Sequence, residues 1–396
     1  MLSTYRDLFN LPGAARIASG GFIARMPIAM DAIAIILFIY SVDKRFALAG
    51  ALTAVAALTT VVSSPLWSKV ADRKGQRFVL SIAVPIRIVA IIAFINLVLA
   101  GAPIWTWFLS IFIAEAGSIS MGSMSRRRWV HIIDSQDKQL LATSYAYESL
   151  ADELVFILGP VITTAIVAAI DPAAGLILGI AFLLVGVPLV ASHKKSDPGV
   201  ELHQGEEKQR SVMRNRNLQA IAIPMTIVGG CFSAVNICVV ALTTEQNLKA
   251  VSGLLLGIWA IGGALSALVN GAIRWKISHG KRFIGYLSGM ALVSLTFPFV
   301  ENLYLLGFLL FLQGTCIAPL LPNGLPIVTH SVTPSQMTQA ITLATAGIPL
   351  TGAISSFFAG QIIDAYGAST GFWLPFVFLA ASLLSTIPYR KLYREV

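Results

Sequence analysis

The stretch Ser144-Tyr-Ala-Tyr-Glu-Ser-Leu-Ala-Asp-Glu-Leu-Val-Phe-Ile-Leu-Gly-Pro160 opens a hydrophobic run that is too long for a helix in the core of a soluble protein. Three carboxylates nevertheless lie inside it, at Glu148, Asp152 and Glu153. An ionised side chain near the middle of a bilayer costs about 2.5–3.5 kcal/mol on insertion scales, so such residues face water, pair with opposite charges or hold protons. Each of these outcomes favours a role in transport.

The spacing of these residues predicts a polar stripe on one side of a helix. Glu148 and Asp152 are four residues apart and share a face, whereas Glu153 is rotated by about 100°. The sequence Gly159-Pro160 follows on the same helix and removes one side chain and one backbone donor. We therefore predict a hinge, or a close approach of a neighbouring helix, at Gly159 and Pro160.

The composition identifies the class of protein. Of the 396 residues, 56% are hydrophobic and only 12% are charged, which is typical of a polytopic membrane protein. The first residues lack the features of a cleaved secretory signal, so we expect the first apolar run to be retained. Cys231, Cys238 and Cys316 lie in apolar runs without metal-ligand spacing, and we predict no disulfide, metal or cofactor.

A hydrocarbon core of about 30 Å needs about 20 apolar residues, and this length predicts an all-α protein with twelve transmembrane helices. The expected spans are about 15–41, 46–67, 78–100, 103–124, 141–170, 174–192, 217–243, 250–273, 283–300, 302–330, 337–364 and 368–389.

The positive charges predict the orientation of the chain. An even number of spans places both termini on one side, and basic residues favour the cytoplasmic side. If both termini are cytoplasmic, the inside segments contain 22 of the 28 lysine and arginine residues. Only Lys44, Arg45 and Lys249 fall in outside loops. The net charge of +9 thus reflects topology, and we expect no nucleic-acid partner.

A long polar stretch at 193–216 divides the expected spans into two sets of six. We predict an amino-terminal bundle at 1–192, a cytoplasmic linker at 193–216 and a carboxy-terminal bundle at 217–396. The sequence Gly75-Gln-Arg-Phe78 recurs as Gly280-Lys-Arg-Phe283 after the eighth span, in the equivalent position. This repeat favours two pseudo-symmetric halves, an arrangement found in transporters.

The chain resembles the major facilitator superfamily over essentially its whole length. The specific part of the resemblance is the loop Ser68-Lys-Val-Ala-Asp-Arg-Lys-Gly-Gln-Arg-Phe-Val-Leu80, which is similar to the loop signature of that superfamily. Asp72, Arg73, Gly75 and Arg77 match it. The resemblance implies that these four residues form a gating loop, in which Asp72 accepts hydrogen bonds from a helix N-terminus and pairs with a basic neighbour.

Two further segments resemble parts of this superfamily. Gly159-Pro160 is similar to the glycine-proline signature of its proton-coupled exporters, although Val155 replaces an upstream glycine. Arg126-Arg-Arg-Trp129 together with the segment 148–156 is similar to bacterial members that are often labelled as sugar or drug efflux permeases. This resemblance implies a multi-pass protein of the bacterial inner membrane, but it says little about the substrate.

The charges inside the expected spans are confined almost entirely to the first half. They are Arg25, Asp31, Arg87, Glu115, Glu148, Asp152 and Glu153. At 1.5 Å per residue, Arg25, Glu115 and Asp152 all lie about 15–18 Å from the start of their spans, near the middle of the bilayer. A desolvated carboxylate can take up and release protons, whereas an arginine stays charged.

We therefore expect Glu115 and Asp152 to be the proton sites, with Glu148 and Arg25 as their partners. Asp31 and Glu153 are further candidates for proton coupling, and Arg87 is a second charge partner. The resemblance implies that Arg25, Asp31 and Glu115 face a central cavity. The alternative is a static set of ion pairs that fixes the first, third, fourth and fifth spans against one another.

The second half offers apolar surface with a few groups that can form hydrogen bonds. Candidate residues of a substrate cavity are Asn236, Trp259, Gln313 and Asn323. Such a lining suits an amphiphilic or weakly polar ligand.

We predict a secondary active transporter, acting by alternating access as a monomer, that couples inward proton flow to export of a small molecule. The main alternative is proton-coupled uptake of a sugar or similar metabolite. A membrane-embedded enzyme acting on a lipid-linked substrate is a third possibility, but no His-Glu-x-x-His, Gly-x-Ser-x-Gly or phosphate-binding loop is present. We therefore expect no enzymatic activity.

Overall fold

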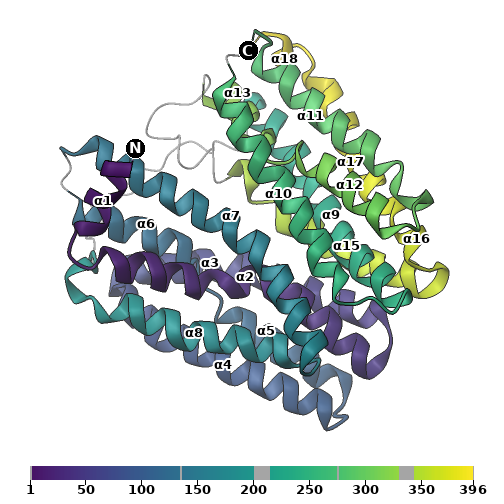
Figure 1. The fold of residues 1–396 in the computed structure, drawn as a ribbon, viewed down its shortest axis with the longest axis horizontal. Helices are drawn as coiled ribbons and strands as arrows, with labels where there is room; N and C mark the ends of the chain where they lie inside the picture. The colour runs from purple at the N-terminus through teal and green to yellow at the C-terminus, as the bar shows by residue number, and fades with distance from the viewer. Residues whose placement is uncertain (1, 134–135, 200–214, 274–275, 330–342, 396) are drawn as a thin grey trace. The chain divides into compact units, whose positions relative to one another are not determined.

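The computed structural model describes residues 2–133, 136–199, 215–273, 276–329 and 343–395, and every regular element in these ranges is helical. Contacts divide the chain into two units (Figure 1). Unit 1 contains residues 1–38 and 59–204, and unit 2 contains residues 39–58 and 205–396. Most of the linker expected at 193–216 lies outside the described residues, so the boundaries expected for the two halves remain a prediction.

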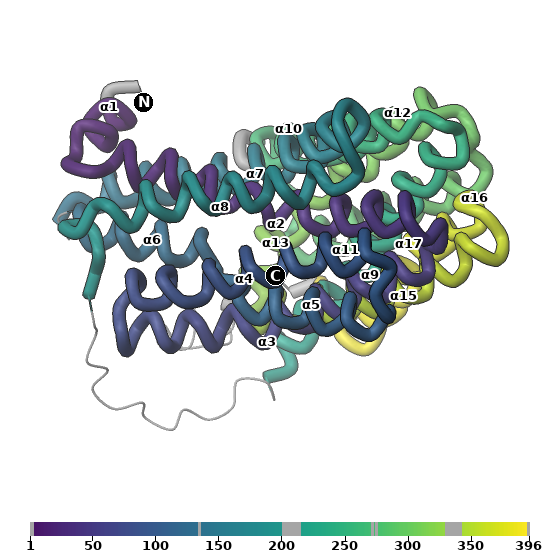
Figure 2. Tube along the Cα trace, turned by 90° about the horizontal axis from the view of Figure 1, so that it is seen from below, coloured from purple at the N-terminus to yellow at the C-terminus, as the bar shows by residue number. Residues whose placement is uncertain are grey.

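Unit 1 is built from apolar helices, because a helix satisfies its own backbone hydrogen bonds in lipid. Its elements are α1 (Leu2–Asn10), most of α2 (Ala14–Asp43), most of α3 (Phe46–Lys74), α4 (Gln76–Leu99), α5 (Ile104–Ala116), α6 (Met121–Ile132), α7 (Lys138–Ala169), α8 (Ala174–Ser192) and the short helix η1 (Lys194–Ser196). Helix α4 packs against α5 and α8, and α7 packs against α6 and α8 (Figure 1 and Figure 2).

Unit 2 contains the remaining helices. They are α9 (Arg216–Glu245), α10 (Val251–Ala272), α11 (His279–Ser294), η3 (Phe297–Phe299), α12 (Leu303–Gly314), α13 (Leu320–Thr329), α15 (Ile348–Tyr366), α16 (Ala368–Gly371), α17 (Trp373–Thr386), η5 (Ile387–Tyr389) and α18 (Leu392–Glu395). Helix α9 packs against α15 and α17, and α10 packs against α12. Unit 2 also includes the end of α2 and the start of α3, through residues 39–58.

In the described ranges, eleven helical stretches are long and apolar enough to cross a membrane, where the sequence predicted twelve. The difference lies at the span expected over 302–330, which consists of two shorter helices, α12 and α13. The start of the span expected at 337–364 falls outside the described residues. The protein is therefore an all-helical, multi-pass membrane protein with at least eleven candidate spans in its described part.

Two of the expected spans are broken. The span expected at 103–124 is interrupted at residues 117–120, between α5 and α6, and its helical stretch continues to Ile132; the span expected at 302–330 is interrupted at residues 315–319, between α12 and α13. The carbonyl groups freed at the first break accept hydrogen bonds from α3: Ser63 Oγ donates to Glu115 O at 2.7 Å, and Trp67 Nε1 donates to Ala116 O at 2.6 Å. In unit 2, Ser266 Oγ donates to the carbonyl of Thr315. Such breaks are stable at membrane depth only where protein groups replace the lost helical bonds.

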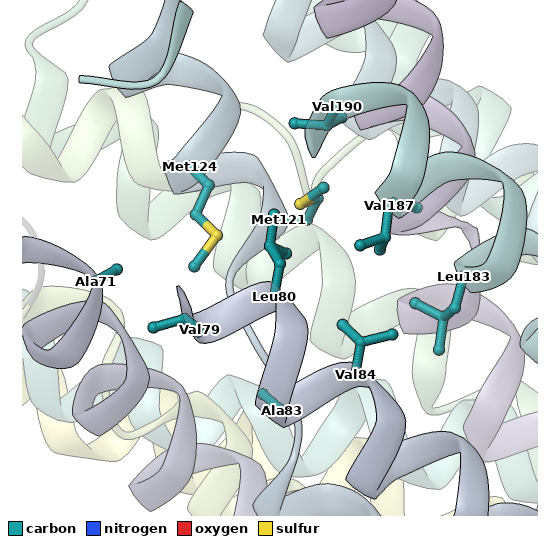
Figure 3. Close-up of a cluster of buried hydrophobic side chains, with 11 residues drawn as sticks. Ala71, Val79, Leu80, Ala83, Val84, Met121, Met124, Leu183, Val187 and Val190 are labelled. Carbon is teal, nitrogen blue, oxygen red and sulfur yellow. The ribbon is translucent and has the colours of Figure 1, made fainter. Parts of the chain in front are cut away.

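A cluster of buried apolar side chains fixes the start of α6. Figure 3 shows side chains of α4, α6 and α8 converging, among them Leu80, Val84, Met121, Leu183 and Val187. Burial of a side chain of this size contributes about 1.5–3 kcal/mol in a soluble protein, and in lipid the tight packing itself holds the helices together. The cluster positions the polar residues that follow on α6.

Unit 2 contains a helix cap supplied by a distant acidic residue. Asp364, near the end of α15, accepts hydrogen bonds from the backbone N–H groups of Phe46 at 2.8 Å and Ala47 at 2.7 Å. These are the first two residues of α3, whose N–H groups have no partner within the helix. The carboxylate also lies at the positive end of the helix dipole, which adds to the stabilisation.

We expect Asp364→Ala to lower the thermal midpoint of the purified protein, because two donors of α3 lose their acceptor. The loss of a cap costs about 0.5–2 kcal/mol. Glu301→Ala is the matched control, since it removes an acidic side chain at an exposed position. Equal midpoints for the two variants would show that the cap does not contribute to stability.

Candidate functional site

Helix α7 presents the predicted stripe of carboxylates to the interior of unit 1. The helix begins at Lys138, where Asp137 caps it by accepting a hydrogen bond from Leu140 N at 2.8 Å. Its buried face includes Ser144, Glu148 and Ala151 and continues to Gly159. Glu148 is only 1% exposed, so its charge must be balanced by neighbouring side chains.

The charge of Glu148 is balanced within a group that we call the four-charge cluster, made of Arg25, Arg126, Glu148 and Asp152. Arg25 of α2 forms ion pairs with both acids of α7, with Glu148 and, at 2.9 Å, with Asp152. Arg126 of α6 pairs with Asp152 at 2.6 Å. Trp129 Nε1 donates a further hydrogen bond to Glu148 Oε1 at 2.6 Å. Two arginines thus balance two carboxylates.

The four-charge cluster has a buried side and an accessible side. The side chains of Arg25 and Glu148 are 5% and 1% exposed, whereas those of Arg126 and Asp152 are 35% and 38% exposed. Glu153 is half-buried and, in the part of the chain that the structure describes, forms no ion pair with the four-charge cluster or with the Asp31, Arg87 and Glu115 side chains. Asp152 therefore lies on the exposed side of the cluster and Glu148 on its buried side.

A second group, which we call the acid-rich cluster, consists of Asp31, Arg87 and Glu115. Arg87 of α4 lies between the two acids: Nη1 donates to Glu115 Oε2 at 2.9 Å, and Nη2 pairs with Asp31. Thr60 Oγ1 of α3 donates to the same Glu115 oxygen at 2.8 Å. The side chains of Arg87 and Glu115 are both 8% exposed, and that of Asp31 is 15% exposed. Here one arginine faces two carboxylates.

Three consecutive arginines on α6 connect this helix to five other elements, α3, α4, α7, α8 and η1. Arg126 reaches α7, and Arg127 pairs with Asp72 at the end of α3. Arg128 is fully buried and donates to Gln76 Oε1 of α4 at 2.8 Å, to Val190 O of α8 at 2.9 Å and to Ser196 Oγ at 2.9 Å. Because successive residues of a helix point about 100° apart, a run of three can contact partners in three directions.

The sequence shows the run Arg126-Arg-Arg, but it does not show which residues these three side chains contact. For the predicted gating loop, the basic neighbour of Asp72 is Arg127, which is remote in sequence. Gly75 is buried and adopts φ +85°, a conformation that favours glycine, between α3 and α4. Arg73 and Arg77 are exposed.

The four polar residues predicted to line a substrate cavity in the second half differ in their surroundings. Gln313 is fully buried and donates to Ser294 Oγ at 2.5 Å, and Asn323 is 1% exposed and donates to Pro319 O at 2.7 Å. Trp259 is 8% exposed and packs edge-on against Phe232. Asn236 is half-buried, with its amide bonded to Phe232 O. Gln313 and Asn323 thus contribute to packing within unit 2.

Gly159 lies at a close contact between α7 and α2. A Cβ atom at this position would lie 2.7 Å from Ala29 Cβ, which is too near for two carbon atoms. Helix α7 continues through Pro160 to Ala169 without a break. The close approach expected at Gly159 is therefore present, whereas a hinging motion at Gly159 and Pro160 remains a prediction.

Among the described residues, no group of three or more His, Cys, Asp or Glu side chains is arranged to hold a metal ion. The chemistry of the site is that of carboxylates and arginines. Such groups can bind protons, ions or charged parts of a small molecule.

We expect Arg25→Met to lower the stability of the purified protein strongly, because Glu148 would keep a buried charge without its arginine. Breaking one side of a buried ion pair costs about 3–5 kcal/mol. Adding Glu148→Gln to Arg25→Met should restore part of the loss, since it removes the unpaired charge. The measurement is the thermal midpoint in detergent.

The matched control is Arg45→Met. Arg45 lies between α2 and α3, its side chain is 55% exposed, and hydrogen bonds from Arg45 to Asp43 raise its pKa. Exposed pairs contribute little to stability, about 0–1 kcal/mol. An equal effect of Arg25→Met and Arg45→Met would contradict the assignment of Arg25 as the balancing charge.

Two glycine substitutions should have opposite effects. Gly159→Ala introduces the clash with Ala29 and should lower the thermal midpoint. Gly285→Ala, on α11, meets no atom within 4 Å and should raise the midpoint slightly, since alanine is a better helix former than glycine by about 1 kcal/mol. A stabilising effect of Gly159→Ala would argue against the close helix contact.

Comparison with known proteins supports the assignment of this geometry to transport. A curated relative is 24% identical over 412 aligned positions, covering 97% of both chains, and is described as the uncharacterized MFS-type transporter y4rN of Sinorhizobium fredii. Among solved structures, the nucleoside transporter NupG superposes with a TM-score of 0.71 at 13% identity, covering 96% of this chain and 98% of the other. The POT family transporter PepTSo gives a TM-score of 0.74 at 9% identity, covering 96% and 97%.

A bacterial metal transporter also has a similar fold, with a TM-score of 0.65 at 13% identity over 95% of this chain and 98% of the other. At these identities the structural likeness establishes the fold alone. The sequence pattern of the family described as Major Facilitator Superfamily matches residues 17–303 and 239–395, which together cover nearly the whole chain. The chain therefore belongs to the major facilitator superfamily, and it is a secondary transporter rather than an enzyme.

Proposed function

We propose that this transporter exports a small amphiphilic or weakly polar compound in exchange for protons, by alternating access. The observation that carries the proposal is the pair of largely buried carboxylates in unit 1, Asp31 of α2 and Glu115 of α5, on either side of Arg87. Buried acids are costly at membrane depth unless they are paired or protonated. A carboxylate that is paired in one state of the transport cycle and protonated in the other is never left as an unpaired buried charge.

The placement of charged residues supports different roles for the two halves of the chain. In the described helices of the second half, α9 to α17, charged residues lie only near helix ends. We propose that protons act on the amino-terminal half, residues 1–192, while the apolar surface of the other half, residues 217–396, accommodates the substrate. Asn236 and Trp259 are the best placed of the polar residues there, because Asn236 is partly accessible and the indole N–H of Trp259 has no hydrogen-bond acceptor among the described residues.

The location follows from the family and from the charge distribution. We propose a monomer in the inner membrane of a bacterial cell, with both termini in the cytoplasm. The positions of the basic residues support this orientation, and the curated relative is bacterial.

Uptake of a polar metabolite is the second candidate. It is favoured by the similar folds of a nucleoside transporter and of peptide transporters of the POT family. The four-charge cluster, whose Asp152 is accessible, offers both signs of charge to a polar substrate. Uptake and export would use the same sites. They are distinguished by whether the compound moves in the same direction as the protons or in the opposite direction.

The experiment is a transport assay in proteoliposomes with an imposed pH gradient. A thermal-shift screen of lipophilic cations, nucleosides and sugars first selects a compound that raises the apparent stability of the protein. We expect this compound to move against its gradient while protons move the opposite way, as recorded by a pH-sensitive dye. Movement of both in the same direction would favour uptake, and flux that ignores the pH gradient would exclude proton coupling.

A further inference from the structure

The two charged clusters of unit 1 differ in one respect that decides which of them can hold a proton. In the four-charge cluster, Arg25 and Arg126 balance Glu148 and Asp152. In the acid-rich cluster, Arg87 alone faces Asp31 and Glu115. Arginine stays protonated in proteins, so the second cluster carries one surplus negative charge whenever both of its acids are ionised.

We propose that the exchangeable proton is shared between Asp31 and Glu115, whereas the four-charge cluster stays ionised and holds helices together. The assignment rests on the proposed proton coupling and deepens it by naming the site. Asp152, which the sequence also suggests as a proton site, is then a structural partner of two arginines.

The surroundings of the acid-rich cluster supply no second positive charge among the described residues. Helix α3 contributes the hydroxyl groups of Thr60 and Ser63, and α4 contributes Arg87. On the side of α8, Gly179 faces Asp31, and a Cβ atom there would lie 3.5 Å from its Oδ1. A buried surplus charge in such surroundings is costly, and two carboxylates that share one site then retain a proton between them.

The position of Glu115 adds a second reason. Glu115 lies in the last turn of α5, directly before the break at residues 117–120. The carboxyl end of a helix carries a partial negative charge, which disfavours a carboxylate. Hydrogen bonds from Ser63 and Trp67 occupy the last carbonyl groups of α5 but bring no net charge.

The contacts of Asp152 differ from those of the acid-rich cluster, because two arginines donate to it. Asp152 Oδ1 accepts from Arg25 at 2.9 Å, and Oδ2 accepts from Arg126 at 2.6 Å. Charge-assisted bonds to two arginines favour the ionised form. Asp152 and Glu148 thus share two arginines, whereas the two acids of the acid-rich cluster share one.

Protonation of the pair has a direct structural consequence. When Glu115 takes the proton, its ion pair with Arg87 becomes a weaker hydrogen bond to a neutral acid, and α5 remains tied to α3 by neutral hydrogen bonds from Thr60, Ser63 and Trp67. The contact between α4 and α5 is thereby weakened next to the break. Helix α6 keeps its own anchors, because its three arginines pair with other residues.

The experiment is infrared difference spectroscopy on the full chain in proteoliposomes, comparing neutral with alkaline pH. A protonated carboxylic acid has a C=O stretching band that an ionised carboxylate lacks. We expect the wild type to show one such band at neutral pH. Asp31→Asn and Glu115→Gln should each abolish it, because the remaining carboxylate is then balanced by Arg87. Asp152→Asn and the control Glu153→Gln should keep it.

The conservative variants Asp31→Glu and Glu115→Asp keep two acids and should keep the band, which separates loss of the proton from misfolding. Survival of the band in both Asp31→Asn and Glu115→Gln, or its loss in Asp152→Asn, would overturn the assignment. So would the absence of the band from the wild type.

The spectroscopic result does not depend on transport, so it separates this inference from the proposed function. If the wild type moves the selected compound without moving protons, the proposed coupling fails, even where the band is present. If the wild type couples the two, Asp31→Asn and Glu115→Gln should lose accumulation driven by the pH gradient but retain exchange of labelled for unlabelled compound. Gradient-driven accumulation at the wild-type level in either variant would contradict the shared site.

Discussion

The pairing of two buried arginines, Arg25 and Arg87, with two carboxylates each is the constraint on which unit 1 depends. Arg25 joins α2 to α7 through Glu148 and Asp152, and Arg87 joins α4 to α2 and α5 through Asp31 and Glu115. A buried charge that loses its partner costs several kcal/mol, so these helices cannot separate unless the charges are replaced or neutralised. The two arginines therefore hold α2, α4, α5 and α7 together through their carboxylate partners.

Much of the fold could be predicted from the sequence, because apolar runs of membrane length are visible in composition alone. The all-helical membrane architecture and the superfamily assignment are confirmed. The spacing of Glu148 and Asp152 placed them on one face, and in the structure they share Arg25 as a partner. The break between α5 and α6 was missed, because Gly117-Ser-Ile-Ser120 is too short and too weakly polar to interrupt an apolar run.

The partners of the site were harder to predict, for a physical reason. Thr60, Ser63 and Trp67 are ordinary residues of an apolar span, and only the fold shows that they surround Glu115 and the carbonyl groups at the break. Arg87 is 28 residues from Glu115 and 56 from Asp31, so helix periodicity gives no information about either contact. The numbers of arginines and carboxylates in a cluster can be compared only once the fold shows which residues belong to it.

The helices that surround the acid-rich cluster extend well beyond it. Asp31 lies on α2 and Thr60 on α3, and both helices continue without a break into residues 39–58, which pack within unit 2. There the start of α3 is held by Asp364, through backbone hydrogen bonds that do not involve the buried acids. The acid-rich cluster therefore lies on continuous helices, and the start of α3 is fixed by contacts that are independent of the buried acids.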